Sequence, residues 1–99
     1  MNSSLPDTLR ATFQQEAEDL CETLEQDLLA LEQTPADTEL INQTFRALHT
    51  LKGVAGMMNV RPVVDLTHEL ETFFDRLRTE RAAPRAETIT LSLTVVDYL

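Results

Sequence analysis

The sequence is poor in residues that interrupt helices or cross-link chains. Its 99 residues include two glycines, four prolines, one cysteine and no tryptophan. Because Cys21 is the single cysteine, no internal disulfide is possible, and no His or Lys close in sequence marks it as a reactive thiol. The scarcity of glycine and proline favours an all-α fold, and the length suits one domain, residues 1–99, with a modest core.

Long apolar runs and targeting signals are also missing. No apolar run approaches the length of a membrane span, and the N-terminal "MNSSLPDTLR" lacks the basic-then-apolar pattern of a signal peptide. We therefore expect a cytoplasmic domain.

Basic residues are scarce and unevenly placed. Eight Lys and Arg against seventeen Asp and Glu give a formal net charge of −9, which argues against a nucleic acid or an anionic membrane as partner. Residues 1–45 contain ten acids and one base, whereas residues 46–61 contain three bases and no acid. This short cationic stretch, with Arg46, Lys52 and Arg61, is suited to meeting an anion.

Hydrophobic periodicity predicts three amphipathic helices. The first covers residues 5–33, with capping-box spacing at Ser4 and Asp7 and an apolar stripe formed by Leu9, Phe13, Ala17, Leu20, Leu24, Leu28 and Leu31. After the turn "TPAD", Asp37 or Thr38 caps a second helix that runs to about Met58. Following "NVRP", Pro62 starts a third helix, which fades in "RTERAAPR".

The last segment, "ETITLSLTVVDYL", fits two structures. Its β-branched residues alternate with polar ones as in a strand, yet Ile89, Leu93 and Val96 also share a helical face. A lone strand would have nothing to pair with, whereas three amphipathic helices need a fourth to close their core. We therefore expect a fourth helix.

Both glycines fall beside a histidine, in "FRALHTLKGVAGMM". Gly53 and Gly56 follow His49 by four and seven residues within the second helix, where each glycine costs roughly 0.5–1 kcal/mol relative to alanine. On a helical wheel His49 points away from the apolar stripe, with Lys52 beside it. An exposed imidazole has a neutral, nucleophilic form at neutral pH, so this arrangement suits a histidine that accepts and passes on a phosphoryl group.

The same residues resemble a known family. His49, Thr50, Leu51, Lys52, Gly53, Ala55 and Gly56 are similar to the active helix of histidine-containing phosphotransfer (HPt) domains, above all the N-terminal phosphotransfer domain of CheA-type chemotaxis histidine kinases. "LTHELETFFDRLR", with His68 and Glu71, resembles that family's third helix. The resemblance implies an up-down four-helix bundle with the active histidine on the second helix.

The resemblance also implies roles for individual residues. His49 would be the phosphoacceptor, Glu71 would accept a hydrogen bond from its Nδ1 and orient the ring, and Lys52 would offset phosphate charge. His68 would join the hydrogen-bond network. Docking of partners would use the exposed residues around His49, namely Gly53, Gly56, Arg46, Asn42 and Met57.

Two partner domains follow from this resemblance. The ATP-binding domain of a kinase would donate the phosphoryl group, and the receiver domain of a response regulator would take it. The chain itself would bind no cofactor or metal, because ATP and Mg²⁺ come with the partners, and it would be a monomer. CheA-type domains usually continue into a fifth helix, whereas this sequence stops at Leu99, near the end of the expected fourth helix. We therefore expect either an excised part of a larger sensor kinase or a stand-alone protein.

Three alternatives remain at this level. His49, His68 and Glu71, with Asp65 or Asp75, would form a metal-binding bundle, although a single His-x-x-Glu pair is a common accident and Lys52 would repel a cation. The chain would otherwise be a helical docking module without phosphoryl chemistry. Independently of both, the two glycines would relieve crowding between helices rather than clear a surface.

Overall fold

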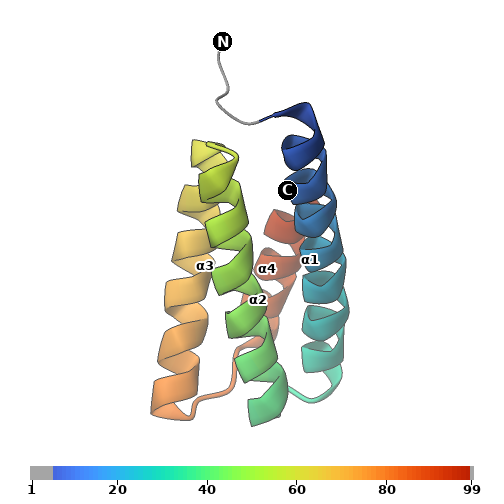
Figure 1. Cartoon of the computed structure of the whole chain (residues 1–99). Coiled ribbons are helices and arrows are strands. Elements are labelled where there is room, and N and C mark those ends of the chain that lie inside the picture. The colour runs from blue at the N-terminus through green and yellow to red at the C-terminus, as the bar shows by residue number, and fades with distance from the viewer. Residues whose placement is uncertain (1–5, 99) are drawn as a thin grey trace.

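The structure, a computed structural model, describes residues 6–98. This part of the chain folds into four helices. They are α1 (Asp7–Gln33), α2 (Thr38–Met57), α3 (Arg61–Glu80) and α4 (Ala86–Tyr98). The helices run up and down in an elongated bundle of 45 × 20 × 20 Å, in which α2 packs between α1 and α3, and α4 packs on α1 (Figure 1). The expected all-α four-helix fold is confirmed.

Local sequence signals explain where the helices begin and end. Asp37 caps α2 as predicted, because its Oδ1 accepts hydrogen bonds from the backbone N–H groups of Glu39 (3.0 Å) and Leu40 (3.2 Å). The first helix begins at Asp7 after Pro6, without a side-chain cap, and Ser4 lies outside the described residues. Pro62 sits in the first turn of α3, where its missing N–H costs nothing.

The turn between α2 and α3 explains how α2 stops just beyond its glycines. Asn59 takes a left-handed conformation (φ 59°), which asparagine tolerates better than most residues. The N–H of Asn59 then donates to the carbonyl of Gly56 (3.1 Å), and the N–H of Val60 to that of Ala55 (3.0 Å). This pair of bonds is a Schellman motif, which satisfies the last carbonyls of α2.

The final segment is a helix, and its burial pattern has a helical period. Ile89, Ser92 and Val96 are buried, whereas Leu91 is 62 % exposed. A strand with alternating sides would have buried Leu91 together with Ile89. The buried Ser92 hydroxyl donates to the carbonyl of Thr88 (2.8 Å), so this polar group is satisfied within α4.

Most of the predicted apolar residues form the core, but the start of α1 is not covered. Leu24, Leu28, Leu31, Ile41, Leu48, Leu51, Phe74 and Ile89 are buried. Leu9, the first residue of the α1 stripe, is 40 % exposed, so the stripe is not covered over the first turn of this helix. The reason is length: at about 1.5 Å per residue, the 13 residues of α4 cover about half of the 27 residues of α1 (Figure 1).

Candidate functional site

His49 lies midway along α2 on the side away from the core. Its side chain is 66 % exposed, as the helical wheel predicts. One turn earlier on the same helix, the ring of Phe45 stacks against the imidazole, with 6.3 Å between the ring centroids and 21° between their planes. The ring therefore faces solvent while its orientation is limited by a neighbour.

Glu71 of α3 supplies the second contact of the imidazole. Its carboxylate is largely buried, and its Oε2 lies 2.6 Å from His49 Nδ1. A carboxylate only accepts hydrogen bonds, so Nδ1 carries the proton and donates it. In a neutral ring Nε2 then holds the free lone pair, which is the form a nucleophilic imidazole requires.

Lys52 contacts the other oxygen of the same carboxylate. Its Nζ lies 2.6 Å from Glu71 Oε1, and its side chain is 28 % exposed. Lys52 follows His49 by one turn, so both residues of α2 face Glu71 across the α2–α3 contact. Both carboxylate oxygens are thus engaged, and the three side chains form one polar cluster where α2 and α3 meet.

The pKa of Glu71 reflects two opposing effects. Burial alone would raise it, but hydrogen bonding with Lys52 and His49, together with the positive charges of these partners, lowers it below the ordinary 4.5. Glu71 is therefore ionised at neutral pH, as an acceptor for the Nδ1 proton must be.

The two glycines leave open space above α2. A Cβ atom added to Gly53 or Gly56 would meet nothing within 4 Å, and both residues are exposed. The alternative that these glycines relieve crowding between helices is therefore wrong. Their effect is to keep the surface beside His49 free of side chains.

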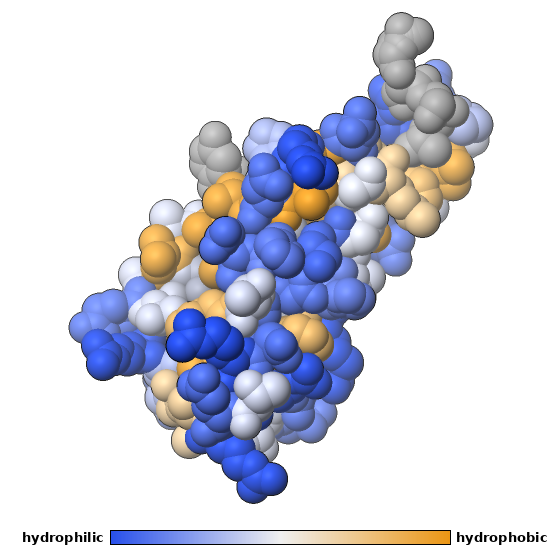
Figure 2. Space-filling view, turned by 90° about the vertical axis from the view of Figure 1, so that its left-hand side faces the viewer, coloured by the Kyte–Doolittle hydropathy of each residue, from blue (hydrophilic) through white to orange (hydrophobic). Residues whose placement is uncertain are grey.

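The other residues predicted for docking differ in exposure. Met57 is 63 % exposed, and Arg46 is exposed with a long ion pair to Glu39 (3.5 Å). Asn42 is half-buried near the start of α2. The side of the molecule on which α3 lies is mostly hydrophilic with small apolar patches (Figure 2).

Within the described residues 6–98, His68 forms no hydrogen bond with the cluster of His49, Lys52 and Glu71. It is exposed on α3, one turn before Glu71. Its role in the network stays a prediction. The described residues also contain no group of three or more His, Cys, Asp or Glu side chains placed to hold a metal ion, so the metal-binding alternative gains no support from the geometry.

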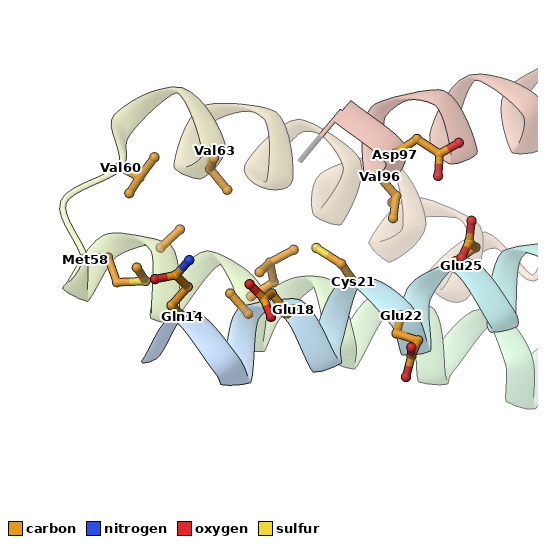
Figure 3. A pocket seen from close by; sticks show the side chains of 13 residues that line it. Gln14, Glu18, Cys21, Glu22, Glu25, Met58, Val60, Val63, Val96 and Asp97 are labelled. Carbon is orange, nitrogen blue, oxygen red and sulfur yellow. The ribbon is translucent and has the colours of Figure 1, made fainter. Parts of the chain in front are cut away.

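A hollow of the described structure lies elsewhere. A space of about 690 Å³ opens beyond the end of α4, between α1, α2 and the start of α3 (Figure 3). It is lined mainly by apolar side chains, among them Leu51 and Ala55 from the inner face of α2, and none of the predicted site residues borders it. No described helix is long and apolar enough to cross a membrane.

Two contributions to the site escaped the sequence analysis. The sequence pattern assigned Phe45 no part in the site, although its position one turn before His49 could have signalled a ring contact. Arg78 of α3 places its guanidinium carbon 4.1 Å from the centroid of the Phe45 ring. Nothing in the sequence pairs these two residues, because the contact depends on how α2 and α3 pack.

The structure is thus a four-helix bundle that carries an exposed imidazole backed by a buried carboxylate on a neighbouring helix. The model of the Hpt domain family matches residues 8–98, and relatives at one third identity cover most of the chain. The chain belongs to the Hpt domain family.

Individual relatives agree with this assignment. The chain is 33 % identical over 87 residues to the chemotaxis protein CheA of Listeria monocytogenes and 34 % identical over 91 residues to that of Rhizobium meliloti. These matches cover 88 % and 92 % of this chain but only 14 % and 12 % of the relatives. The solved CheA phosphotransferase domain from Thermotoga maritima is similar in structure, with a TM-score of 0.74 and 34 % identity over 92 % of this chain and 93 % of that one.

Proposed function

We propose that the chain is a phosphotransfer domain of two-component signalling and that His49 is its phosphoacceptor. The observation that carries this proposal is the 2.6 Å contact between His49 Nδ1 and Glu71 Oε2 on an otherwise exposed ring. Membership of the Hpt family supports it, as does the likeness to a CheA phosphotransferase domain.

The first half-reaction loads the histidine. The lone pair of His49 Nε2 attacks the γ-phosphorus of ATP, which a kinase domain holds together with Mg²⁺, and the bond from phosphorus to the ADP oxygen breaks. The ring gains positive character while Nδ1 keeps its proton. The carboxylate of Glu71 stabilises that charge through the hydrogen bond it already accepts.

The second half-reaction unloads it. A receiver domain of a response regulator brings an aspartate whose carboxylate oxygen attacks the phosphorus, and the N–P bond breaks with its electrons returning to Nε2. The ring is again neutral with its proton on Nδ1, so neither half-reaction needs a proton from this chain. The partners supply ATP and Mg²⁺, and this domain contributes the nucleophile and its orientation.

Docking of both partners uses the surface cleared by Gly53 and Gly56. The open space above both glycines supports this proposal, because a partner backbone can approach the helix closely there. Met57 offers an exposed apolar contact beside it, and Arg46 and Asn42 flank His49 toward the start of α2.

Lys52 and His68 have secondary roles in this proposal. The main role of Lys52 is to hold Glu71 through the 2.6 Å ion pair, and its secondary role is to offset the charge of the phosphoryl group. His68 contributes a polar group at the edge of the site on α3.

The test is chemical loading of the purified chain. Phosphoramidate transfers a phosphoryl group to histidines without any partner, and the intact mass reports the product. We expect one acid-labile phosphoryl group on the wild type and on His68→Gln, the control that removes the other histidine. We expect none on His49→Gln, with its helical circular dichroism unchanged because the side chain is exposed. Loading of His49→Gln, or failure of the wild type to load, would contradict the proposal and favour a docking module without phosphoryl chemistry.

A further inference from the structure

A chain of contacts outside the Glu71 cluster leads from α3 to the imidazole. Asp75 Oδ1 accepts from Arg78 Nη2 at 2.7 Å, one turn away on α3. The guanidinium of Arg78 lies over the Phe45 ring, with 4.1 Å from Cζ to the centroid, and the Phe45 ring stacks on His49. Three successive contacts thus connect an anchored cation on α3 with the exposed ring on α2.

The Glu71 hydrogen bond restrains the rotation of His49 about χ1 only while the bond is formed. It holds Nδ1, but a side chain that is 66 % exposed can still swing about χ1 whenever this bond opens. A helical residue has two or three staggered χ1 wells to visit. A ring stacked against one side of the imidazole disfavours the wells that would carry it away from that neighbour.

Phe45 can restrain His49 only if its own ring is held. Its inner edge packs against the hydrophobic core, and Arg78 covers it from α3 by a cation–π contact. The ion pair with Asp75 holds the planar guanidinium of Arg78 in place over the ring.

We propose that Phe45 and Arg78 are positioning residues that hold the imidazole of His49 in the χ1 rotamer from which Nε2 attacks phosphorus. The inference rests on the proposed function of His49 and adds to it a second restraint, independent of Glu71. In this proposal both residues act through His49, by the contacts of Arg78 with Phe45 and of Phe45 with the imidazole.

Arg76 provides a matched control on the same helix. Like Arg78, Arg76 forms an ion pair with an acid of its own helix, Glu80, at 3.8 Å. Unlike Arg78, Arg76 makes no cation–π contact within residues 6–98. Arg76→Gln and Arg78→Gln therefore make the same change of charge on α3, and only the second removes a contact to Phe45.

The experiment uses the whole chain and two measurements. One is the rate of His49 phosphorylation by phosphoramidate, a donor too small to depend on docking. The other is the set of three-bond NMR couplings of the His49 β-protons, which report its χ1 distribution. Phe45→Leu and Arg78→Gln remove the restraint, whereas Phe45→Tyr keeps the aromatic ring and Arg76→Gln is the charge control.

We expect wild type, Phe45→Tyr and Arg76→Gln to show one dominant rotamer and equal rates. We expect Phe45→Leu and Arg78→Gln to show averaged couplings and a rate about two- to threefold lower, since two or three wells would then share the population. If Phe45→Leu unfolds, the test still rests on Arg78→Gln and Phe45→Tyr. Arg78 is half exposed, and the tyrosine retains the contact with the core.

Equal couplings and rates in Arg78→Gln and Arg76→Gln would overturn the inference, and so would a lower rate with unchanged couplings. Failure of the proposed function is distinct from both, because the wild type itself would then not be phosphorylated. Averaged couplings in Phe45→Leu and Arg78→Gln, joined to the lower rate, would support the positioning role.

Discussion

Glu71 Oε2 lies 2.6 Å from His49 Nδ1, although the two residues are 22 positions apart and lie on different helices. This contact decides which nitrogen of the ring carries the proton and which faces outward. We expect Glu71→Ala to keep the fold and slow phosphoryl uptake from phosphoramidate by about tenfold to a hundredfold, the range found for carboxylates that orient metal-bound histidines. Glu71→Gln should be less severe, because its amide oxygen can still accept from Nδ1. Equal rates in Glu71→Ala and wild type would show that Glu71 does not assist phosphoryl uptake by His49.

Lys52 should act mainly through Glu71. Its ammonium lies 2.6 Å from Glu71 Oε1, so Lys52→Met frees one carboxylate oxygen and removes a cation that lowers the pKa of Glu71. We expect Lys52→Met to slow uptake in the wild-type background but to add little to Glu71→Gln. Phosphoramidate rates of the two single variants and the double variant measure this coupling. Additive effects would mean that Lys52 acts directly on the phosphoryl group.

Acid should weaken the contribution of Glu71 to stability. Its folded pKa lies below the ordinary 4.5, so the ionised carboxylate favours the folded state. That stabilisation is fully present above pH 4.5 and is lost as the pH falls through the lower folded pKa. The difference in unfolding free energy between wild type and Glu71→Gln should therefore shrink as the pH falls from about 6 to about 3. Urea unfolding across this range measures it, and a difference independent of pH would contradict the assignment.

Alanine at the glycines should separate stability from docking. Because a Cβ at Gly53 or Gly56 meets no atom within 4 Å, each alanine should stabilise α2 by about 0.5–1 kcal/mol. We expect unchanged loading by phosphoramidate but slower transfer to any receiver domain that accepts the phosphoryl group from the wild type. Urea unfolding and transfer rates measure the two effects. Stabilised variants with undiminished transfer would show that the cleared surface is not used in docking.

Cys21 should be a slow thiol. Burial raises its pKa, with a smaller contribution from the charge of Glu18, and the side chain lines the hollow beyond α4 (Figure 3). Less thiolate is then present at about pH 8 than in a free cysteine. We expect iodoacetamide to label the folded chain several-fold more slowly than the chain in denaturant. Equal labelling rates would mean that folding neither shields the thiol from the reagent nor raises its pKa.

The amino-acid sequence by itself determined the helices and the exposed histidine. Periodic apolar residues, the Asp37 cap and Pro62 act within a turn or two, so their effects can be predicted without knowing the fold. The position of His49 opposite the apolar stripe, with Gly53 and Gly56 beside it, is a property of one helix. The final segment was ambiguous, and packing on α1 decided in favour of a helix.

Only the tertiary structure decided which side chains of α3 reach those of α2, although the family resemblance had implied the contact of Glu71 with His49. The packing of α3 against α2 brings Glu71 to Nδ1 and Lys52 and places Arg78 over Phe45, contacts between residues more than a dozen positions apart. It also left Leu9 exposed, because α4 is too short to cover the start of α1. Spacing along a helix predicts neighbours on that helix, whereas contacts across a seam depend on how the side chains of two helices interlock.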